Sequence, residues 1–282
     1  MSCAAPELSS AIDYLVPSSR INRRFWAPGR EFNTGIYAPY PVAIRNARMS
    51  GPFTLDDHGF CLGHHHSEIT DWEHNYQADS AYARQVGEVA KTLSGADLVL
   101  PMGGMVRSSG ETSAVIQPPA AEAHVDFTQS CAERIARSMY AKGCAEGPGY
   151  DRFIAFSLWR VLSPPPQDMP LALCDGRSVG DDEGTPNTKV DVAEIPVGDA
   201  LFASIEGEET MAAATIFHYS PNHRWWYFPD MTPDEVIFIK LYDSDHRRAW
   251  RCPHTAFRDN TRADARQRRS MEFRAIAYFS TR

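Results

Sequence analysis

The chain has 282 residues, of which 43% are hydrophobic and 23% charged, and its formal net charge at pH 7 is −8. This composition is typical of a globular protein that can bury a substantial core, and the acidic balance argues against a nucleic-acid partner. The six cysteines show no C-x-x-C spacing. No stretch resembles a secretory leader or approaches the roughly eighteen apolar residues of a membrane span. We therefore expect a reduced, cytoplasmic protein with no membrane span.

Residues 1–50 are broken by proline and glycine, which predicts a largely irregular N-terminal arm laid over the core, with a short strand at 12–16. Residues 51–282 are expected to form that core, so that residues 1–282 make a single domain. Three consecutive histidines occupy 64–66. Adjacent residues of a strand point to opposite faces, so these three cannot converge on one ion, and we expect them to be exposed or locally hydrogen-bonded.

Two segments have the apolar periodicity of amphipathic helices. The first covers 78–93, with Asp79 or Ser80 as its N-cap and Gly95 suited to its end. The second covers 128–142. Between them, 96–101 reads as a buried strand followed by a glycine-rich turn at 103–104.

The second half of the chain is rich in strand signals separated by turns. An acidic segment at 179–188 is predicted to be a surface loop. The spacing of the strands predicts an antiparallel meander folded into a sandwich or barrel with helices packed outside. The predicted strands are 152–162, 171–175, 214–219, 224–228, 235–242 and 270–279.

The clearest chemical pattern is the His-x-Asp pair formed by His124 and Asp126. On an extended segment both side chains point to one face, where they would supply two ligands of the 2-His-1-carboxylate set that binds non-haem Fe(II). His254, in an apolar and aromatic setting, is the candidate third ligand. Arg268 and Ser270 follow two residues apart, and an arginine and a hydroxyl so spaced on a strand can hold a carboxylate. His-x-Asp, a late His and then Arg-x-Ser is the order found in 2-oxoglutarate-dependent oxygenases.

Six blocks of the sequence match, in order, the motifs of one known family. They read FSLWRVL at 156–162, MPLALCD at 169–175, WWYFPDMTPDE at 225–235, IKLYDS at 239–244, PHTAF at 253–257 and RRSMEFR at 268–274. Over roughly residues 50 to 280 the chain thus resembles the fungal hydroxylase/desaturase family, which includes gibberellin desaturase-like and cephamycin methoxylation-like proteins. The resemblance implies a β-rich double-stranded β-helix, a jelly-roll or cupin-like core, with flanking helices.

The sequence departs from the family pattern at three positions. Val161 stands where the family usually has proline, Arg269 where it has glutamate, and Asn260 where it often has proline. None of these positions is a candidate ligand, so the iron site is expected to be intact.

The resemblance implies a non-haem Fe(II)/2-oxoglutarate-dependent dioxygenase, an oxidoreductase of secondary-metabolite biosynthesis. With Fe(II) on His124, Asp126 and His254, three coordination positions remain for 2-oxoglutarate and O2. A small-molecule substrate would then be hydroxylated, desaturated or rearranged through a ferryl intermediate.

Four residues are candidates for binding the co-substrate. Arg268 and Ser270 are expected to hold its distal carboxylate, and Arg274, six positions after Arg268 on the same strand face, is a rival anchor. Arg160 lies in an otherwise apolar strand, and a charge there needs a partner. That partner is either a ligand carboxylate or a structural one such as Asp175.

Three aromatic residues, Trp159, Trp225 and Tyr227, are candidates for lining a substrate cavity, although such stripes also build cores. Two other functions stay open: an Fe(II) oxygenase or isomerase that does not use 2-oxoglutarate, and a non-catalytic small-molecule-binding β-barrel. A homodimer in which the arm crosses to a partner is also left open.

Overall fold

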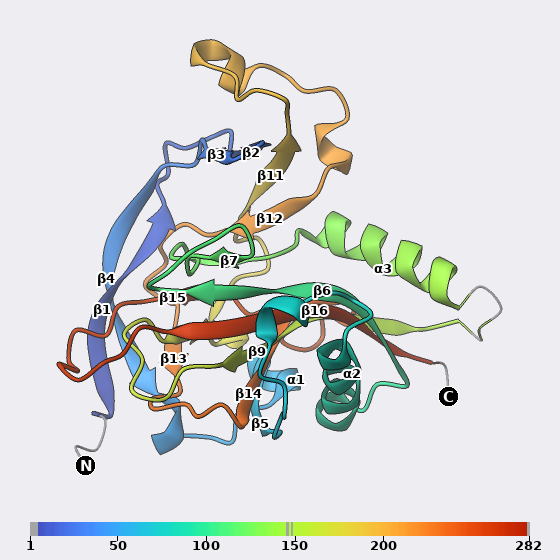
Figure 1. Ribbon diagram of the computed structural model, residues 1–282. Coiled ribbons are helices and arrows are strands. Elements are labelled where there is room, and N and C mark those ends of the chain that lie inside the picture. Colours follow the sequence, from blue (N-terminus) through green and yellow to red (C-terminus); the bar gives the residue numbers. More distant parts are fainter. Residues whose placement is uncertain (1–4, 145–146, 148, 281–282) are drawn as a thin grey trace.

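The computed structural model describes residues 5–144, 147 and 149–280, which form two β-sheets facing each other with helices outside (Figure 1). The larger sheet has ten strands in the order β1-β4-β13-β10-β15-β8-β12-β11-β2-β3. Their bounds are β1 Glu7–Leu15, β2 Arg23–Ala27, β3 Arg30–Asn33, β4 Tyr37–Asn46, β8 His124–Val125, β10 Leu171–Cys174, β11 Thr185–Asp191, β12 Ala213–Ile216, β13 Trp225–Tyr227 and β15 His254–Ala256.

The smaller sheet has six strands in the order β5-β14-β9-β16-β6-β7. Neighbours such as β14 and β9 lie far apart in sequence, as they do in a jelly roll, so the predicted sandwich is correct but a simple meander is wrong. The strand bounds are β5 Phe60–His64, β6 Leu98–Ser108, β7 Ile116–Gln117, β9 Arg152–Val161, β14 Glu235–Asp243 and β16 Arg269–Phe279.

Both predicted helices are present and pack on the smaller sheet (Figure 1). Helix α2 (Ala81–Ser94) begins after Ser80, whose hydroxyl accepts the Ala83 N–H, and it ends at Gly95 in the left-handed conformation. Helix α3 (Gln129–Gly143) begins after Thr128, whose hydroxyl accepts the Cys131 N–H. The short helices are α1 Leu55–His58 and the 3₁₀ turns Ala47–Met49, Trp72–His74, Gly176–Ser178, Gly198–Phe202 and Glu208–Thr210.

The N-terminal segment is not the irregular arm that the sequence predicts. It contributes β1 to β4, and β1 pairs with β4 along its whole length from Glu7↔Arg45 to Leu15↔Tyr37. The last residues of β4 then pair in parallel with β13, so the segment is an integral part of the larger sheet.

Two further local predictions need correction. Gly103 and Gly104 are not a turn but lie inside β6, which runs on to Ser108. A Cβ at Gly104 would lie 2.6 Å from the Glu272 carbonyl oxygen, so glycine allows β6 to approach β16 closely. The predicted surface loop at 179–188 ends early, because β11 begins at Thr185.

Side chains alternate along the central strands between an outer face, which packs under α2, and an inner face, which points toward the other sheet. Phe156 and Leu158 of β9 pack with Phe238 of β14 in the cluster under α2. Trp159, on the other face of β9, packs with Leu173 of β10 from the opposite sheet. The inner face of both sheets therefore forms the space in which functional side chains can meet.

Candidate metal centre

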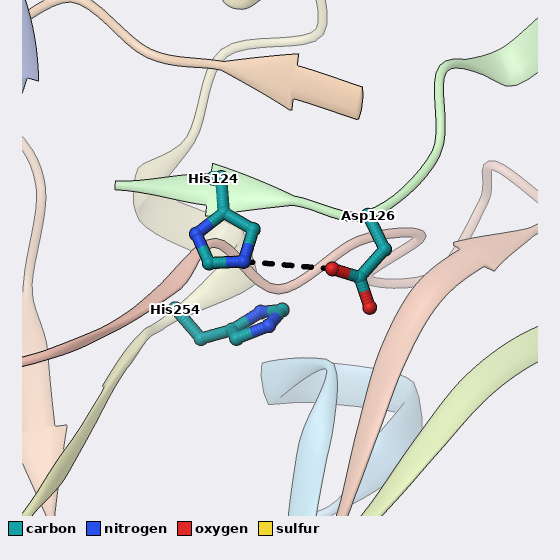
Figure 2. A group of neighbouring side chains, drawn as sticks. All are labelled: His124, Asp126 and His254. Carbon is teal, nitrogen blue, oxygen red and sulfur yellow. Dashed lines mark ion pairs between the residues drawn. The ribbon is translucent and has the colours of Figure 1, made fainter. Parts of the chain in front are cut away.

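Three side chains from two adjacent strands of the larger sheet meet on its inner face. His124 lies on β8 and Asp126 follows that strand, while His254 begins β15 and is paired directly opposite His124. The ligand atoms of His124, Asp126 and His254 all lie within 4.8 Å of one another, so this group could hold a metal ion. Figure 2 shows His124 and Asp126 side by side with the His254 ring beneath them.

Backbone contacts fix which imidazole nitrogen faces the site. Nδ1 of His124 lies 2.8 Å from the Glu122 carbonyl oxygen, and Nδ1 of His254 lies 3.1 Å from the Cys252 carbonyl oxygen. A carbonyl only accepts hydrogen bonds, so both Nδ1 atoms carry the proton and both Nε2 lone pairs are left for a metal. Nε2 of His124 lies 3.5 Å from Oδ1 of Asp126.

At neutral pH, Asp126 and His254 have the charge states that suit a divalent cation. Burial, with repulsion from His124, lowers the pKa of His254 to about 4, which keeps its imidazole neutral near pH 7. Burial opposes the charge of Asp126, but Arg274 and the two imidazoles lower the pKa of its carboxyl well below its usual range. The pKa of His124 is raised, because Asp126 outweighs the effect of burial.

Beside the triad lies a buried arginine that lacks an anionic partner. Arg268 is 1% exposed, its Nη1 donates to the Met169 carbonyl oxygen at 2.6 Å, and its Nε makes no hydrogen bond. Glu272 and Asp168 are near enough to favour its charge, but among the described residues neither they nor any other carboxylate forms an ion pair with it. Its guanidinium lies 5.7 Å from the Trp159 ring, and both residues line the small cavity that contains His124 and His254.

Ser270 shares this situation. It is fully buried in β16, it follows Arg268 by two positions along this extended segment, and its hydroxyl has no hydrogen-bond partner. Buried polar groups are normally satisfied, and an unpaired buried charge is costly. The unpaired donors of Arg268 and Ser270 therefore fit a carboxylate ligand bound next to the metal position.

Sequence reasoning missed two charged residues of this site, Glu272 and Arg107. Glu272 accepts from Nε and Nη2 of Arg107 at 2.7 and 3.0 Å, and from Nη2 of Arg274 at 2.8 Å. Glu272 could have been found, since it continues the alternation of Arg268, Ser270 and Arg274 along one strand face. Arg107 carries no such signal.

Two of the four residues predicted to bind the co-substrate, Arg160 and Arg274, make hydrogen bonds to other groups of the protein. Arg160 lies on the outer face of β9 and donates to the carbonyl oxygens of His65 and Pro233 and to the Tyr82 hydroxyl, so the structure does not bring it to the site. Its predicted structural partner, Asp175, pairs with Arg177 instead. Arg274 reaches the site, but its Nε donates to Oδ2 of Asp126 at 2.8 Å.

Of the three predicted substrate aromatics, only Trp159 lines the metal cavity. The indole N–H of Trp225 donates to the Tyr14 hydroxyl at 2.8 Å, and the Tyr227 ring packs edge-on against Phe257. Trp225 and Tyr227 lie on the opposite face of β13 from Trp226, whose ring packs against the cluster that contains Trp159 and Leu173.

The expectation for the histidines at 64–66 is confirmed, since the first and third are exposed and the second contacts Arg160.

A surface depression of about 520 Å³ adjoins the cavity. It is bordered by β2, β3 and residues 112–122, and two of its lining residues, Arg107 and Ala120, also line the metal cavity. Its volume is in the range typical of small-molecule sites.

Comparison with known proteins is consistent with this geometry. Residues 14–278 match the family described as YDMC: Oxidoreductase/YMDC permease-like domain. The chain belongs to this family. Although the description includes the word permease, no helix in the described residues is both long and apolar enough to span a membrane.

The curated relatives are fungal enzymes, which confirms the resemblance seen in the sequence. Hydroxylase/desaturase efuI of Hormonema carpetanum is 29% identical over 263 residues, covering 86% of this chain and 85% of that protein. The Fe(II)/2-oxoglutarate-dependent dioxygenase nvfI of Aspergillus novofumigatus is 26% identical over 261 residues, covering 89% of this chain and 87% of that protein.

A solved structure confirms the predicted fold. The iron and alpha-ketoglutarate-dependent endoperoxidase NvfI superimposes with a TM-score of 0.81 at 22% identity, covering 98% of this chain and 99% of that chain. The β-rich jelly-roll architecture with flanking helices is therefore correct.

Proposed function

We infer that this protein is an Fe(II)/2-oxoglutarate-dependent oxygenase that oxidises a small-molecule secondary metabolite. The observation that carries this proposal is the buried guanidinium of Arg268, which has no ion-pair partner and lines the same cavity as His124 and His254 of the triad. The triad supports a metal, and the arginine supports an anionic co-substrate beside it. The names of relatives such as efuI and nvfI support the same activity.

In this proposal His124 and His254 would hold Fe(II) through their Nε2 atoms and Asp126 through its Oδ1. Fe(II) with 2-oxoglutarate and O2 supplies an oxidant able to break an unactivated C–H bond. The protein orients both imidazoles and keeps that of His254 neutral, and its buried cavity limits the access of water. Trp159 forms one wall against which substrate or co-substrate packs.

Arg268 and Ser270 would bind the distal carboxylate of 2-oxoglutarate, by a charge-assisted hydrogen bond and a hydroxyl donor respectively. The same observation disfavours an Fe(II) enzyme that does without this co-substrate, because Arg268 would then stay buried without an ion-pair partner. It also disfavours a non-catalytic barrel, which has no need of the triad.

The surface depression beside β2 and β3 is the proposed route for the substrate. Whether the product is hydroxylated, desaturated or rearranged depends on where that substrate lies relative to the metal. The cytoplasmic location and the homodimer remain predictions.

The test is an anaerobic titration of the Fe(II)-loaded protein with 2-oxoglutarate, followed by visible charge-transfer absorption. We expect a band in the wild type that is lost when His124, Asp126 or His254 is replaced by alanine, and that needs far more co-substrate in Arg268→Ala. Arg269→Ala is the matched control, because Arg269 is the next residue of the same segment and pairs with Glu73. Iron binding with no band at any concentration would refute the role of 2-oxoglutarate.

A further inference from the structure

The metal-binding carboxylate of Asp126 is held by a chain of charged groups. Its Oδ1 faces His124, while its Oδ2 accepts the Nε–H of Arg274 at 2.8 Å. Arg274 thus occupies one carboxylate oxygen and leaves the other for the metal. The orientation of Asp126 then depends on where Arg274 is held.

Glu272 holds Arg274 in place. One of its oxygens accepts from Nη2 of Arg274 at 2.8 Å, and both accept from Arg107 at 2.7 and 3.0 Å. Without this carboxylate, two guanidinium groups would face each other in a largely enclosed space, with side chains only 29% and 14% exposed. Their repulsion would displace Arg274 from Asp126.

Arg107 is anchored at the outer end of the chain. Its Nη1 donates to the Pro118 carbonyl oxygen at 2.8 Å, in the segment 112–122 that borders the surface depression. The contacts therefore form a chain that begins at the segment 112–122 and continues through Arg107, Glu272 and Arg274 to the carboxylate of Asp126.

We propose that Glu272 is a positioning residue for the metal centre, acting on Asp126 through Arg274. This inference rests on the proposed Fe(II) site and adds a residue that does not touch the metal. Outer groups that orient metal ligands typically contribute tenfold to hundredfold in metal affinity. The expected effect of breaking the chain is a loss of about that size.

The metal affinities of two variants distinguish a positioning role of Glu272 from a simple effect of its negative charge. Glu272→Gln removes a negative charge near the metal, so charge and positioning both predict weaker binding. Arg274→Lys keeps the charge but loses the planar two-point contact, so only positioning predicts weaker binding. If Glu272 acts through Arg274, the two losses are not additive.

The experiment measures the dissociation constant of Mn(II), without co-substrate or turnover, by calorimetry for the wild type, both single variants and the double variant. Glu208→Gln is the matched control, since Glu208 forms a similar two-point pair with Arg23 away from the cavity. We expect tenfold or greater weakening in each single variant, no further weakening in the double variant, and wild-type affinity in the control. Thermal unfolding of the metal-free proteins checks that each variant folds. If Glu272→Gln does not fold, the Mn(II) affinity of Arg274→Lys tests the inference.

Two outcomes would overturn the inference while leaving the proposed function standing: Arg274→Lys binding Mn(II) as tightly as the wild type, or a double variant whose loss equals the product of both single losses. If the wild type itself binds no Mn(II) and no Fe(II), the proposed function fails and this inference with it.

Discussion

Replacing Arg268 by methionine should stabilise the metal-free protein while destroying its affinity for 2-oxoglutarate. Burial, together with repulsion from Arg107, outweighs the attraction of Glu272 and Asp168 and lowers the pKa of Arg268 from 12.5 to about 9, an effect on the order of 5 kcal/mol against the charged form at 1.36 kcal/mol per tenfold change. An arginine stays protonated at physiological pH, so the folded protein bears this cost until an anion binds. A buried methionine of similar length avoids it.

Two favourable contacts of Arg268 offset part of that gain. Its hydrogen bond to the Met169 carbonyl contributes about 2 kcal/mol, and its position over Trp159 about 1 kcal/mol. The net expectation is a metal-free Arg268→Met protein more stable by about 1 to 2 kcal/mol. For a chain of this size that corresponds to a rise in Tm of roughly 2 to 4 °C.

The order of stability should reverse once the co-substrate binds. Loss of a buried charge pair costs about 2 to 5 kcal/mol of binding, or roughly thirtyfold to several thousandfold in affinity. At one hundred times its dissociation constant, 2-oxoglutarate should stabilise the wild type by about 2.7 kcal/mol and the variant hardly at all.

The assay is chemical denaturation under anaerobic conditions, with and without Mn(II) and 2-oxoglutarate, for the wild type, Arg268→Met and the control Arg269→Met. A variant that is less stable than the wild type without ligands would refute the interpretation of Arg268 as an uncompensated buried charge. A variant that binds 2-oxoglutarate as tightly as the wild type would refute its role as the anchor.

Three further predictions concern the same cavity and the fold around it. Ser270→Ala should weaken 2-oxoglutarate binding by roughly tenfold to hundredfold in the same titration, with Mn(II) affinity unchanged, because one hydrogen bond to the ionised carboxylate is lost. Metal affinity should fall as pH drops, because protons compete with the metal for each imidazole. Since the pKa of His124 is raised, a proton competes there at and above pH 6.5. A second proton competes at His254 near pH 4, because the pKa of this imidazole is about 4. Calorimetry across pH should therefore give a slope of one decade per pH unit between about pH 6 and 4, steepening below, and a flat profile would contradict this account. Ser80→Ala should lower the free energy of unfolding by about 1 kcal/mol through loss of the α2 cap, whereas Ser80→Asp should retain it, as measured by urea denaturation.

Much of the site could be predicted from the sequence because it depends on local geometry. The two-residue period of a strand places His124 and Asp126 on one face without any knowledge of the fold. The same period places Arg268 beside Ser270. Helix α2 was equally predictable, because a capping serine and a terminal glycine satisfy its ends through contacts within a few residues.

The N-terminal strands could not be predicted because their stability comes from pairing at a distance. Strand β4 contains Pro39 and Pro41, which usually argue against a strand. Both lie where β4 pairs only with β1, since β13 joins β4 at Ile44 and beyond. A missing N–H is tolerated at such an unpaired edge, and only the sheet order reveals that the edge exists.

The choice among equivalent side chains was also made by tertiary structure. Trp159 and Trp225 look alike in sequence. Of these two, only Trp159 lines the cavity beside His124 and His254, because it lies on the inner face of β9, whereas Trp225 lies on the outer face of β13. Arg160 and Arg268 are both buried arginines in apolar surroundings. Carbonyl oxygens from distant loops satisfy Arg160, whereas Arg268 has lone donors next to the triad. The sequence thus determined which residue types share a strand face, and long-range packing decided which of those faces meet and which charge is left for a ligand.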